Sequence, residues 1–438
     1  MKAMHSPCRK RSERVRRRSG LSWGAGDRTQ VYTARMPIVV RTVTPAEFPK
    51  AIETFCAAFT MHLPDDLLRR KQLLSSPDRT LAAFDGDVML GTATFFPFDL
   101  TVPGGTTIPI GGVADAGVLP TARRRGVFRL IMESQLRSLR DHGLVAAMLH
   151  PTEDTLYGRY GYGAATLEAK ISVDTTNVEF IGHAPDGRLE LVSAHEARQL
   201  LPALHDRYRL MQPGDVSRSP AWWDDHVTEY AYRTDRPNAL FHLFYTSPSG
   251  SLDGYAAFRP SSNRFPESMT AEGVFATTGE AEQAIWRHLL ARDLIGRVDI
   301  DPAPVDGLLR WLVADRHSVA TTTHDQNWLR LLDVRAAMES RSYACDGRLA
   351  VRVSDPLFSE NDGTFTLEVA GGHAVCRRTE DVPPDVDIDI ADLASLYLGG
   401  VTLSVLVRAG RTTASDGTVQ LADDMFSTQR APFASLFF

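Results

Sequence analysis

The chain has 438 residues, of which 43% are hydrophobic and 23% are charged. This content fills several cores, so it excludes a wholly disordered protein and fits roughly three domains of ~150 residues each. No apolar run approaches the ~18 residues of a membrane span. The four cysteines (Cys8, Cys56, Cys345 and Cys376) lie far apart. They argue against a disulfide scaffold or a zinc site and favour a reducing, cytoplasmic setting.

The net charge of −6 is unevenly distributed along the chain. Residues 1–35 hold ten basic and two acidic side chains, so the remainder is strongly acidic. The basic segment has two interpretations, an arm for nucleic acid or anionic membranes and a disordered extension. We favour the interpretation that residues 1–36 are a disordered leader. The segment lacks the apolar stretch of a secretory signal. The acidic body makes nucleic acid a poor partner and favours a small cationic molecule.

Residues 38–175 contain alternating strand and helix signals. Apolar periodicity and turn residues predict strands, a helix that begins at a capping-box pattern, and a closing strand–helix–strand–turn series. The expected strands are 38–43, 80–85, 88–97, 98–102, 107–119 and 145–149, and the expected helical segments are 44–59, 64–74, 126–141 and 154–160.

Residues 176–325 partly repeat this order. Helices are expected at 195–210, 220–229 and 279–293, and strands at 239–245, 253–259, 269–276 and 297–301. The turn at 273–280 stands where the first part has its basic loop, but it holds no arginine. We interpret this as an internal duplication with one degenerate copy. The last part has short strands, an apolar core helix at 390–398 and an apolar end at 434–438, which is expected to dock.

The most informative stretch is the strand, basic loop and helix of residues 114–128, which read ADAGVLPTARRRGVF. A helix N-terminus offers unpaired N–H groups and a partial positive charge, which suit a pyrophosphate. Gly126 allows close approach of the backbone, and the arginines neutralise phosphate charge. The alternative is a solvated basic loop before an ordinary helix.

A second motif, L-Y-G-R-Y-G-Y-G, follows at 156–163. Together with V-x-P-x-x-R-R-R-G, it resembles the Eis (enhanced intracellular survival) family of GCN5-related N-acetyltransferases. The resemblance implies an α+β fold with an acetyltransferase domain at 37–175, a degenerate copy at 176–330 and a sterol-carrier-like α/β domain at 331–438.

The resemblance also implies roles for individual residues. Ten residues would bind the co-substrate acetyl-CoA. They lie on the strand before the loop, in the basic loop, at the start of the helix and after the following strand: Ala116, Gly117, Val118, Arg123, Arg124, Arg125, Gly126, Val127, Phe128 and Thr152. Tyr157 would be the general acid, and the α-carboxylate of Phe438 the general base. The spacing of the histidines and cysteines predicts no metal site. The resemblance implies a homohexamer that acetylates amines.

The sequence departs from the aminoglycoside-modifying members where the amine would bind. Phe437 stands in place of an acidic residue, and the segment 59–62 reads F-T-M-H. These departures argue against aminoglycoside activity, although Asp65, Asp66 and Asp115 are candidates to supply the missing acid. Other candidates have ordinary structural interpretations, which we favour: packing for Tyr160, Tyr162 and Cys56, and a structural role for His150.

Two functions remain open from the sequence. The preferred one is an acetyl-CoA-dependent N-acetyltransferase that acts on a primary amine of a small cationic molecule or of lysine. The alternative is a non-catalytic ligand-binding or scaffold protein that uses its sterol-carrier-like domain. The intact R-R-R-G loop and Tyr157 favour the enzyme.

Overall fold

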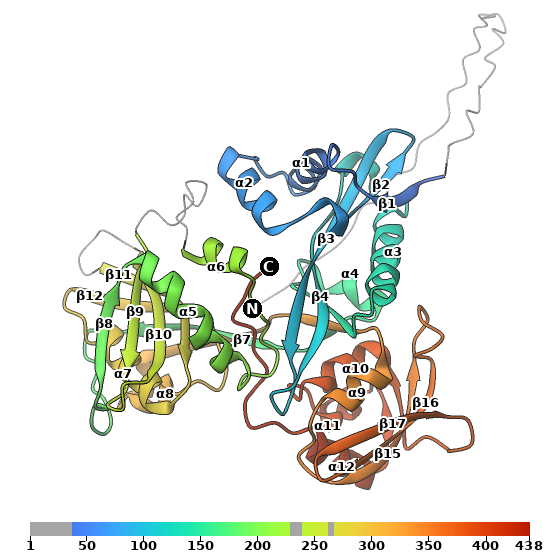
Figure 1. The fold of residues 1–438 in the computed structure, drawn as a ribbon. Coiled ribbons are helices and arrows are strands. Elements are labelled where there is room, and N and C mark those ends of the chain that lie inside the picture. The colour runs from blue at the N-terminus through green and yellow to red at the C-terminus, as the bar shows by residue number, and fades with distance from the viewer. Residues whose placement is uncertain (1–36, 228–238, 262–266) are drawn as a thin grey trace, which may run out of the picture. The chain divides into compact units, whose positions relative to one another are not determined.

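Three β-sheets, each with its own helices, make up the body of the protein (Figure 1). This computed structural model describes residues 37–227, 239–261 and 267–438. Within it, Ile38–Phe438 form one unit. The leader predicted for 1–36 lies outside the described residues.

The first sheet has seven strands and carries the basic loop. The strands predicted at 88–97 and 98–102 are a single strand, because pairing with the next strand continues across the expected boundary, at Pro97↔Gly111 and Phe98↔Ile110. In spatial order the strands are β1 (Val39–Thr42), β2 (Thr80–Asp85), β3 (Val88–Thr101), β4 (Thr107–Val118), β5 (Ala146–Leu149), β14 (Trp328–Leu331) and β6 (Gly163–Ala164).

Helices cover both faces of this sheet (Figure 1). The helices α1 (Phe48–Ala58) and α2 (Asp65–Leu74) pack on one side and α3 (Val127–Asp141) on the other, while the short α4 (Asp154–Tyr157) follows β5. Apolar residues spaced three or four apart drive this packing. The α3 face that is buried against the sheet consists of Val127, Ile131, Met132, Leu136 and Leu139. Cys56 of α1 is 2% exposed, which confirms its place in the core.

The second sheet repeats the strand–helix–strand unit, since parallel strands β11 and β12 are joined by α7. Its spatial order is β13 (Val319–Asp325), β7 (Leu167–Asp174), β12 (Ile295–Ala303), β11 (Glu267–Ala276), β10 (Leu252–Pro260), β9 (Phe241–Thr246) and β8 (Arg188–Val192). Its helices are α5 (Ala194–Arg209), α6 (Pro220–Val227), α7 (Gly279–Leu290) and α8 (Leu309–Leu312).

The first two sheets exchange strands across the boundary predicted at 175/176. Strand β7 lies before that boundary but pairs with β12 and β13 in the second sheet. Strand β14 comes from the end of the second part but inserts between β5 and β6 in the first sheet. The boundaries therefore stay a prediction, and the two sheets are interleaved along the chain.

The third sheet belongs to the C-terminal part, in the order β17 (His373–Thr379), β16 (Gly363–Ala370), β15 (Gly347–Ser354), β18 (Val386–Asp389) and β19 (Thr413–Ala414). Its helices are α9 (Val334–Ser340), α10 (Ile390–Tyr397), α11 (Leu403–Arg408) and α12 (Asp416–Phe426). All eight residues of α10 are buried, as expected for a core helix. One hydrophobic cluster contains both Ile110 and Met148 of the first sheet and Leu393 of α10.

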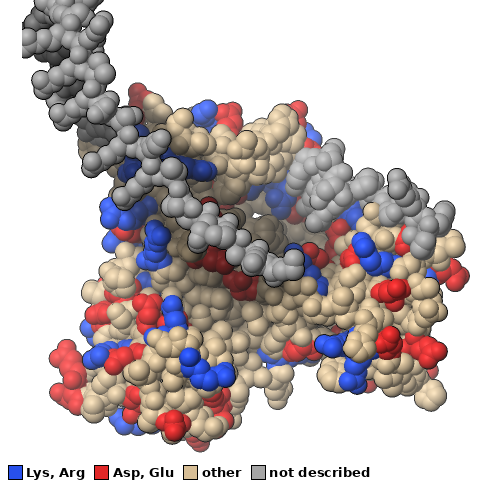
Figure 2. Space-filling view, turned by 180° about the vertical axis from the view of Figure 1, so that it is seen from behind, with Lys and Arg blue, Asp and Glu red and all other residues tan. Residues whose placement is uncertain are grey.

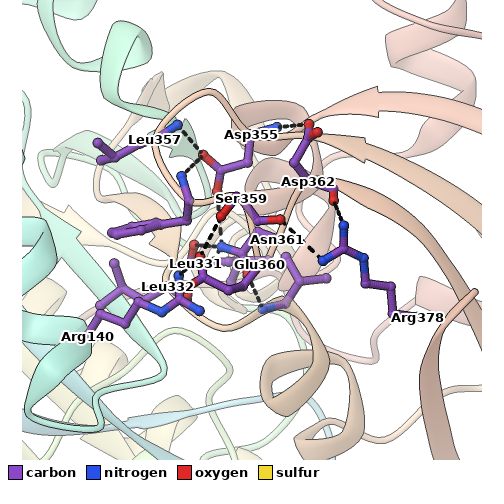
Figure 3. A network of polar contacts seen from close by, with 12 residues as sticks. Arg140, Leu331, Leu332, Asp355, Leu357, Ser359, Glu360, Asn361, Asp362 and Arg378 are labelled. Atoms are coloured by element: carbon purple, nitrogen blue, oxygen red, sulfur yellow. Dashed lines mark hydrogen bonds and ion pairs between the residues drawn. The ribbon is translucent and has the colours of Figure 1, made fainter.

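A buried polar network, whose part around Asp355 and Asn361 is drawn in Figure 3, fastens the C-terminal part to β14. The guanidinium of Arg330 donates to both carboxylate oxygens of Asp355 at 2.7 and 2.8 Å, and both side chains are 0% exposed. The Asn361 amide donates to the same carboxylate at 3.0 Å and to the carbonyl of Leu332 at 3.2 Å. Removing one partner would leave a buried charge uncompensated, so this network fixes the junction firmly.

Basic and acidic side chains are interspersed on the face drawn in Figure 2. In the described part of the chain, no helix is both long and apolar enough to cross a bilayer.

Candidate active site

Parallel strands β4 and β5 separate at the centre of the first sheet. They pair at Ile110↔Ala146, Gly111↔Ala147 and Gly112↔Met148, after which β5 ends and β4 continues to Val118. A bulge against β3 falls in the same part of β4, where Asp115 has a φ of 52°. Extra residues in a strand bend it and increase its twist. From Val113 onward β4 still pairs with β3, but its other edge, where β5 has ended, faces a cleft.

The basic loop turns this strand into α3. Gly126 is the residue before the helix, with a φ of +77°, and a Cβ built on it would meet no atom within 4 Å. No side chain of the described residues caps this helix end. The N–H groups of the first turn, which include those of Val127 and Phe128, therefore point into open space beside the loop, which is the arrangement that binds phosphate groups.

A cleft of about 510 Å³, here called the arginine cleft, opens at this helix end. Its walls contain nine of the ten residues predicted to bind the co-substrate: Ala116, Gly117, Val118, Arg123, Arg124, Gly126, Val127, Phe128 and Thr152. Arg125 is the exception, because its guanidinium pairs with Asp85 at 2.7 Å and does not line the cleft. The spacing of the motif could not reveal this partner, which lies on β2.

The equivalent helix end in the second sheet is closed. The hydroxyl of Thr278 accepts a hydrogen bond from Ala281 N–H, so a side chain caps α7. Glu282 lies in the first turn, and its carboxylate accepts from Leu308 N–H at 2.9 Å and from the Trp286 indole at 3.3 Å. A capped, acidic helix end does not suit an anion, which agrees with a degenerate second copy.

Tyr157 lies where the arginine cleft meets a second cavity. It lines both, together with Phe59, Ala116 and Thr152. The side chain is 5% exposed, and its ring contacts Phe128 edge-on with centroids 6.1 Å apart. Burial raises the pKa of the phenol above its ordinary value of 10.0, although a hydrogen bond with Thr152 opposes the shift. The hydroxyl therefore keeps its proton at neutral pH and can donate it.

The second cavity, here called the aromatic pocket, has a volume of about 340 Å³. Rings from α1, β3, α6 and the C-terminal tail surround it: Phe55, Phe59, Phe96, Trp222, Phe437 and Phe438. Phe438 packs on Phe98 with centroids 5.0 Å apart, and Phe437 packs edge-on against His150 at 4.8 Å. Burial lowers the pKa of His150, so its ring is neutral at pH 7. The end of the chain thus forms one wall of this pocket.

Buried polar groups hold the tail in this position. Asp215, which is 0% exposed, accepts the backbone N–H of Ser435 at 2.9 Å and its hydroxyl at 2.8 Å. Arg218 donates to the Ser435 carbonyl at 2.8 Å, and the Gln326 amide donates to the Ala434 carbonyl at 2.7 Å. Burial favours the neutral form of Asp215, but its hydrogen bond with His205 and the nearby cations hold its pKa below the ordinary value.

The acidic candidates for amine binding are arranged differently from the expectation. Asp65 and Asp66 begin α2 and do not line the aromatic pocket. Asp115 does line it, but its carboxylate forms an ion pair with Lys71, which is also in the wall. Arg70 in the same wall pairs with Asp225 of α6 at 2.6 Å. The charged side chains of the wall are therefore matched in pairs.

The glycines of the second motif have a packing role that the sequence did not reveal. A Cβ on Gly163 would lie 1.8 Å from the Ala391 carbonyl of α10, and one on Gly161 would lie 2.8 Å from Arg330. Tyr162 is 0% exposed within a hydrophobic cluster, as expected for a packing residue. The motif therefore both places Tyr157 and fits the C-terminal part against the first sheet.

Sequence reasoning also missed Trp222, Lys71 and Arg70 in the pocket wall. Trp222 comes from a helix of the second part, well beyond both motifs in the sequence, and no local pattern links them. The sequence held a weak indication that Phe55 and Phe59 lie side by side, because residues four apart on a helix share one face.

Comparison with known proteins places this site in a family context. Residues 39–165 and 214–335 each match an acetyltransferase (GNAT) domain family, and residues 334–435 match a sterol carrier protein domain family. An uncharacterized N-acetyltransferase of Streptomyces avermitilis is 33% identical over 82% of this chain and 88% of its own length. The N-acetyltransferase Eis of Mycobacterium tuberculosis is 30% identical over 92% of this chain and 100% of its own. The crystal structure of Eis1 from Mycobacterium abscessus superposes with a TM-score of 0.81 at 32% identity, covering 91% of this chain and 100% of that one.

Proposed function

The chain belongs to the Eis family of GCN5-related N-acetyltransferases, and we propose that it transfers an acetyl group from acetyl-CoA to the primary amine of a small molecule. The observation that carries this proposal is the meeting of two cavities at Tyr157. The arginine cleft has an open helix end that suits a diphosphate, and the aromatic pocket has room for an acceptor.

The arginine cleft would hold the co-substrate through separate contacts to its parts. Arg123 and Arg124 would neutralise the phosphates, and the N–H groups of Val127 and Phe128 would bind them directly. The β4 backbone of Ala116–Val118, left without β5 as a neighbour, would pair with the pantetheine. Gly126 would let the diphosphate approach the helix end, since a side chain there would fill the open space.

Two groups would move the protons of the reaction. A protonated amine must lose a proton before its nitrogen attacks the thioester carbonyl, and the α-carboxylate of Phe438, a residue that lines the pocket, would accept that proton. The C–N bond forms, the C–S bond breaks, and the coenzyme A sulfur leaves as a thiolate. The Tyr157 hydroxyl, protonated at neutral pH, would donate its proton to that sulfur.

Thermal denaturation with and without acetyl-CoA, followed by a turnover screen of amines, tests this function. Ligand at 100 times its dissociation constant adds about 2.7 kcal/mol to the free energy of unfolding. No shift with acetyl-CoA would favour the non-catalytic ligand-binding or scaffold alternative. From the family resemblance we also propose that the protein is cytoplasmic and forms a homohexamer. The molar mass from light scattering would check the hexamer.

A further inference from the structure

The second sheet has a cavity of its own, which the proposed acetyl transfer does not use. It lies at the N-terminus of α7, has a volume of about 310 Å³ and is here called the α7 pocket. Among the described residues, none lines both this pocket and either the arginine cleft or the aromatic pocket. The side chains that decide its chemistry are Tyr208, Gln212, Glu282, Asp306 and Arg430.

Tyr208 brings a buried polar group to this pocket. Its side chain is 4% exposed, and its hydroxyl forms no hydrogen bond within the described residues. Burial raises the pKa of the phenol, so the hydroxyl is protonated at neutral pH. The nearby charges that also act on this pKa include those of Arg430, Glu282 and Asp306, all in the pocket wall. Leaving a buried hydroxyl without a partner is destabilising, so its position indicates a polar ligand.

The charged side chains of the wall also keep free hydrogen-bonding groups. Glu282 accepts both of the hydrogen bonds described above through one oxygen, Oε1, and Asp306 accepts the N–H of Ala431 through Oδ2 at 2.7 Å. The other oxygen of each carboxylate has no partner in the described part of the chain. Within the same residues, Arg430 forms an ion pair with neither carboxylate. Burial raises the pKa of Glu282, and the charge of Arg430 is among the influences that oppose this shift, so the two groups lie near each other without direct contact.

Contacts within the protein hold this wall in place. The side-chain amide of Gln212, which is 2% exposed, donates to the Ala431 carbonyl at 2.7 Å, while Asp306 accepts the N–H of the same residue. These two bonds fix the segment that carries Arg430. Trp286 is 4% exposed and adds an apolar surface beside Glu282. A ligand therefore meets groups that are already ordered, which lowers the entropic cost of binding.

We infer that the α7 pocket is a binding site for a free α-amino acid with an apolar side chain. The ammonium group lies between the unpartnered oxygens of Glu282 and Asp306. The carboxylate accepts hydrogen bonds from Arg430 and from the Tyr208 hydroxyl, away from the capped helix end, and the side chain lies against Trp286. A zwitterion matches the charges of both signs, whereas a simple cation leaves the guanidinium unmatched and a simple anion leaves the carboxylates unmatched.

The test titrates the full chain with L-leucine, L-valine and L-phenylalanine by isothermal titration calorimetry, with and without saturating acetyl-CoA. We expect one site per chain and an affinity that acetyl-CoA does not change, because the two ligands share no wall residue. No binding by any of the three amino acids, or competition with acetyl-CoA, would overturn the inference. Binding is measured without turnover, so this result is independent of the proposed acetyl transfer.

Two analogues of leucine test the requirement for both charges. Isopentylamine lacks the carboxylate and 4-methylpentanoate lacks the ammonium group, while both keep the apolar side chain. Without acetyl-CoA, each should bind at least about tenfold more weakly than L-leucine, the effect of one lost charge-assisted contact. Equal affinity for either analogue would overturn the assignment of a zwitterion.

Matched variants test the position of the site. Glu282→Gln removes the charge but keeps an oxygen for the Trp286 indole, and it should weaken L-leucine about tenfold or more. Glu280→Gln changes an exposed residue of the same helical turn outside the wall and should have no effect. Arg430→Met should likewise weaken binding about tenfold, whereas Arg310→Met, at an exposed position of α8 outside the wall, should not. Unchanged affinity in Glu282→Gln or in Arg430→Met, or an equal loss in the matching control, would overturn the inference.

Discussion

Replacing Tyr157 with phenylalanine separates the catalytic role of its hydroxyl from the packing role of its ring. The edge-on contacts with Phe128 and Tyr162, both with centroids 6.1 Å apart, need only the ring and persist in Tyr157→Phe. What disappears is the hydroxyl and its hydrogen bond with Thr152, an exposed residue whose own hydroxyl can then bond to water. A neutral hydrogen bond of this kind contributes about 0.5–1.5 kcal/mol to the free energy of unfolding. Because Thr152 is exposed, we expect the loss in Tyr157→Phe to lie near the lower end of this range.

The expected effect on catalysis is much larger. General acid catalysis contributes roughly 10²–10⁴-fold, or about 2.7–5.5 kcal/mol at 1.36 kcal/mol per tenfold. For Tyr157→Phe, urea denaturation should therefore show only a small loss in the free energy of unfolding. Steady-state release of coenzyme A should show that kcat falls by at least about a hundredfold. Because burial raises the pKa of Tyr157 above 10.0, the phenol is protonated throughout the neutral range. In the kcat profile of the parent enzyme, the midpoint of any loss from this group should lie above pH 10.

Tyr160→Phe is the matched control, since Tyr160 lines the arginine cleft but not the aromatic pocket. Its kcat should stay within about threefold of the parent, because its hydroxyl has no place beside the reacting atoms. Full turnover in Tyr157→Phe would refute the acid role. An equal loss in both variants would show that a hydroxyl in the cleft matters for binding instead.

Four further changes test other parts of the site. Arg124→Ala should raise the KM for acetyl-CoA about tenfold or more. Arg125→Ala breaks only a surface ion pair, worth about 0–1 kcal/mol, and should change this KM little. Equal effects in the two variants would refute the assignment of Arg124 to the phosphates. Adding one glycine after Phe438 should abolish turnover but preserve stabilisation by acetyl-CoA; surviving turnover rules out the carboxylate as base. Ser435→Ala should lower kcat without changing acetyl-CoA affinity, and a change in affinity alone would contradict a positioning role. Tyr162→Phe removes a buried hydroxyl that has no hydrogen-bond partner among the described residues, so its free energy of unfolding should rise by about 1 kcal/mol; a fall would show a hidden partner.

Local features of the site were readable from the sequence. The helix predicted at 126–141 begins at Val127, because Gly126 in the left-handed region ends the loop. The strand predicted at 145–149 is β5, because four consecutive apolar residues fill a buried strand. The arginine cleft follows from these two elements together with the end of β4 and the basic loop that leads into the helix, and this information lies within about forty residues.

Features that depend on distant partners were not readable. Arg123, Arg124 and Arg125 have the same side chain and adjacent positions, yet Arg125 pairs with Asp85 while the other two line the cleft. The charge balance of the aromatic pocket likewise depends on Asp225, which approaches Arg70 from the second part of the chain. Pairing between remote residues follows from tertiary packing, which motif spacing does not encode.

The insertion of β14 into the first sheet has a consequence for synthesis of the protein on the ribosome. When β5 emerges, the strand that covers its outer edge has not been made, and it arrives only after the entire second sheet. At roughly 5–20 residues per second, the nascent chain carries an open β5 edge for on the order of ten seconds or more. Unpaired strand edges are sites of misassembly, so the nascent chain is exposed to misassembly during this interval. A fragment that stops after the first acetyltransferase domain would lack β14, so that edge of β5 would stay open in it.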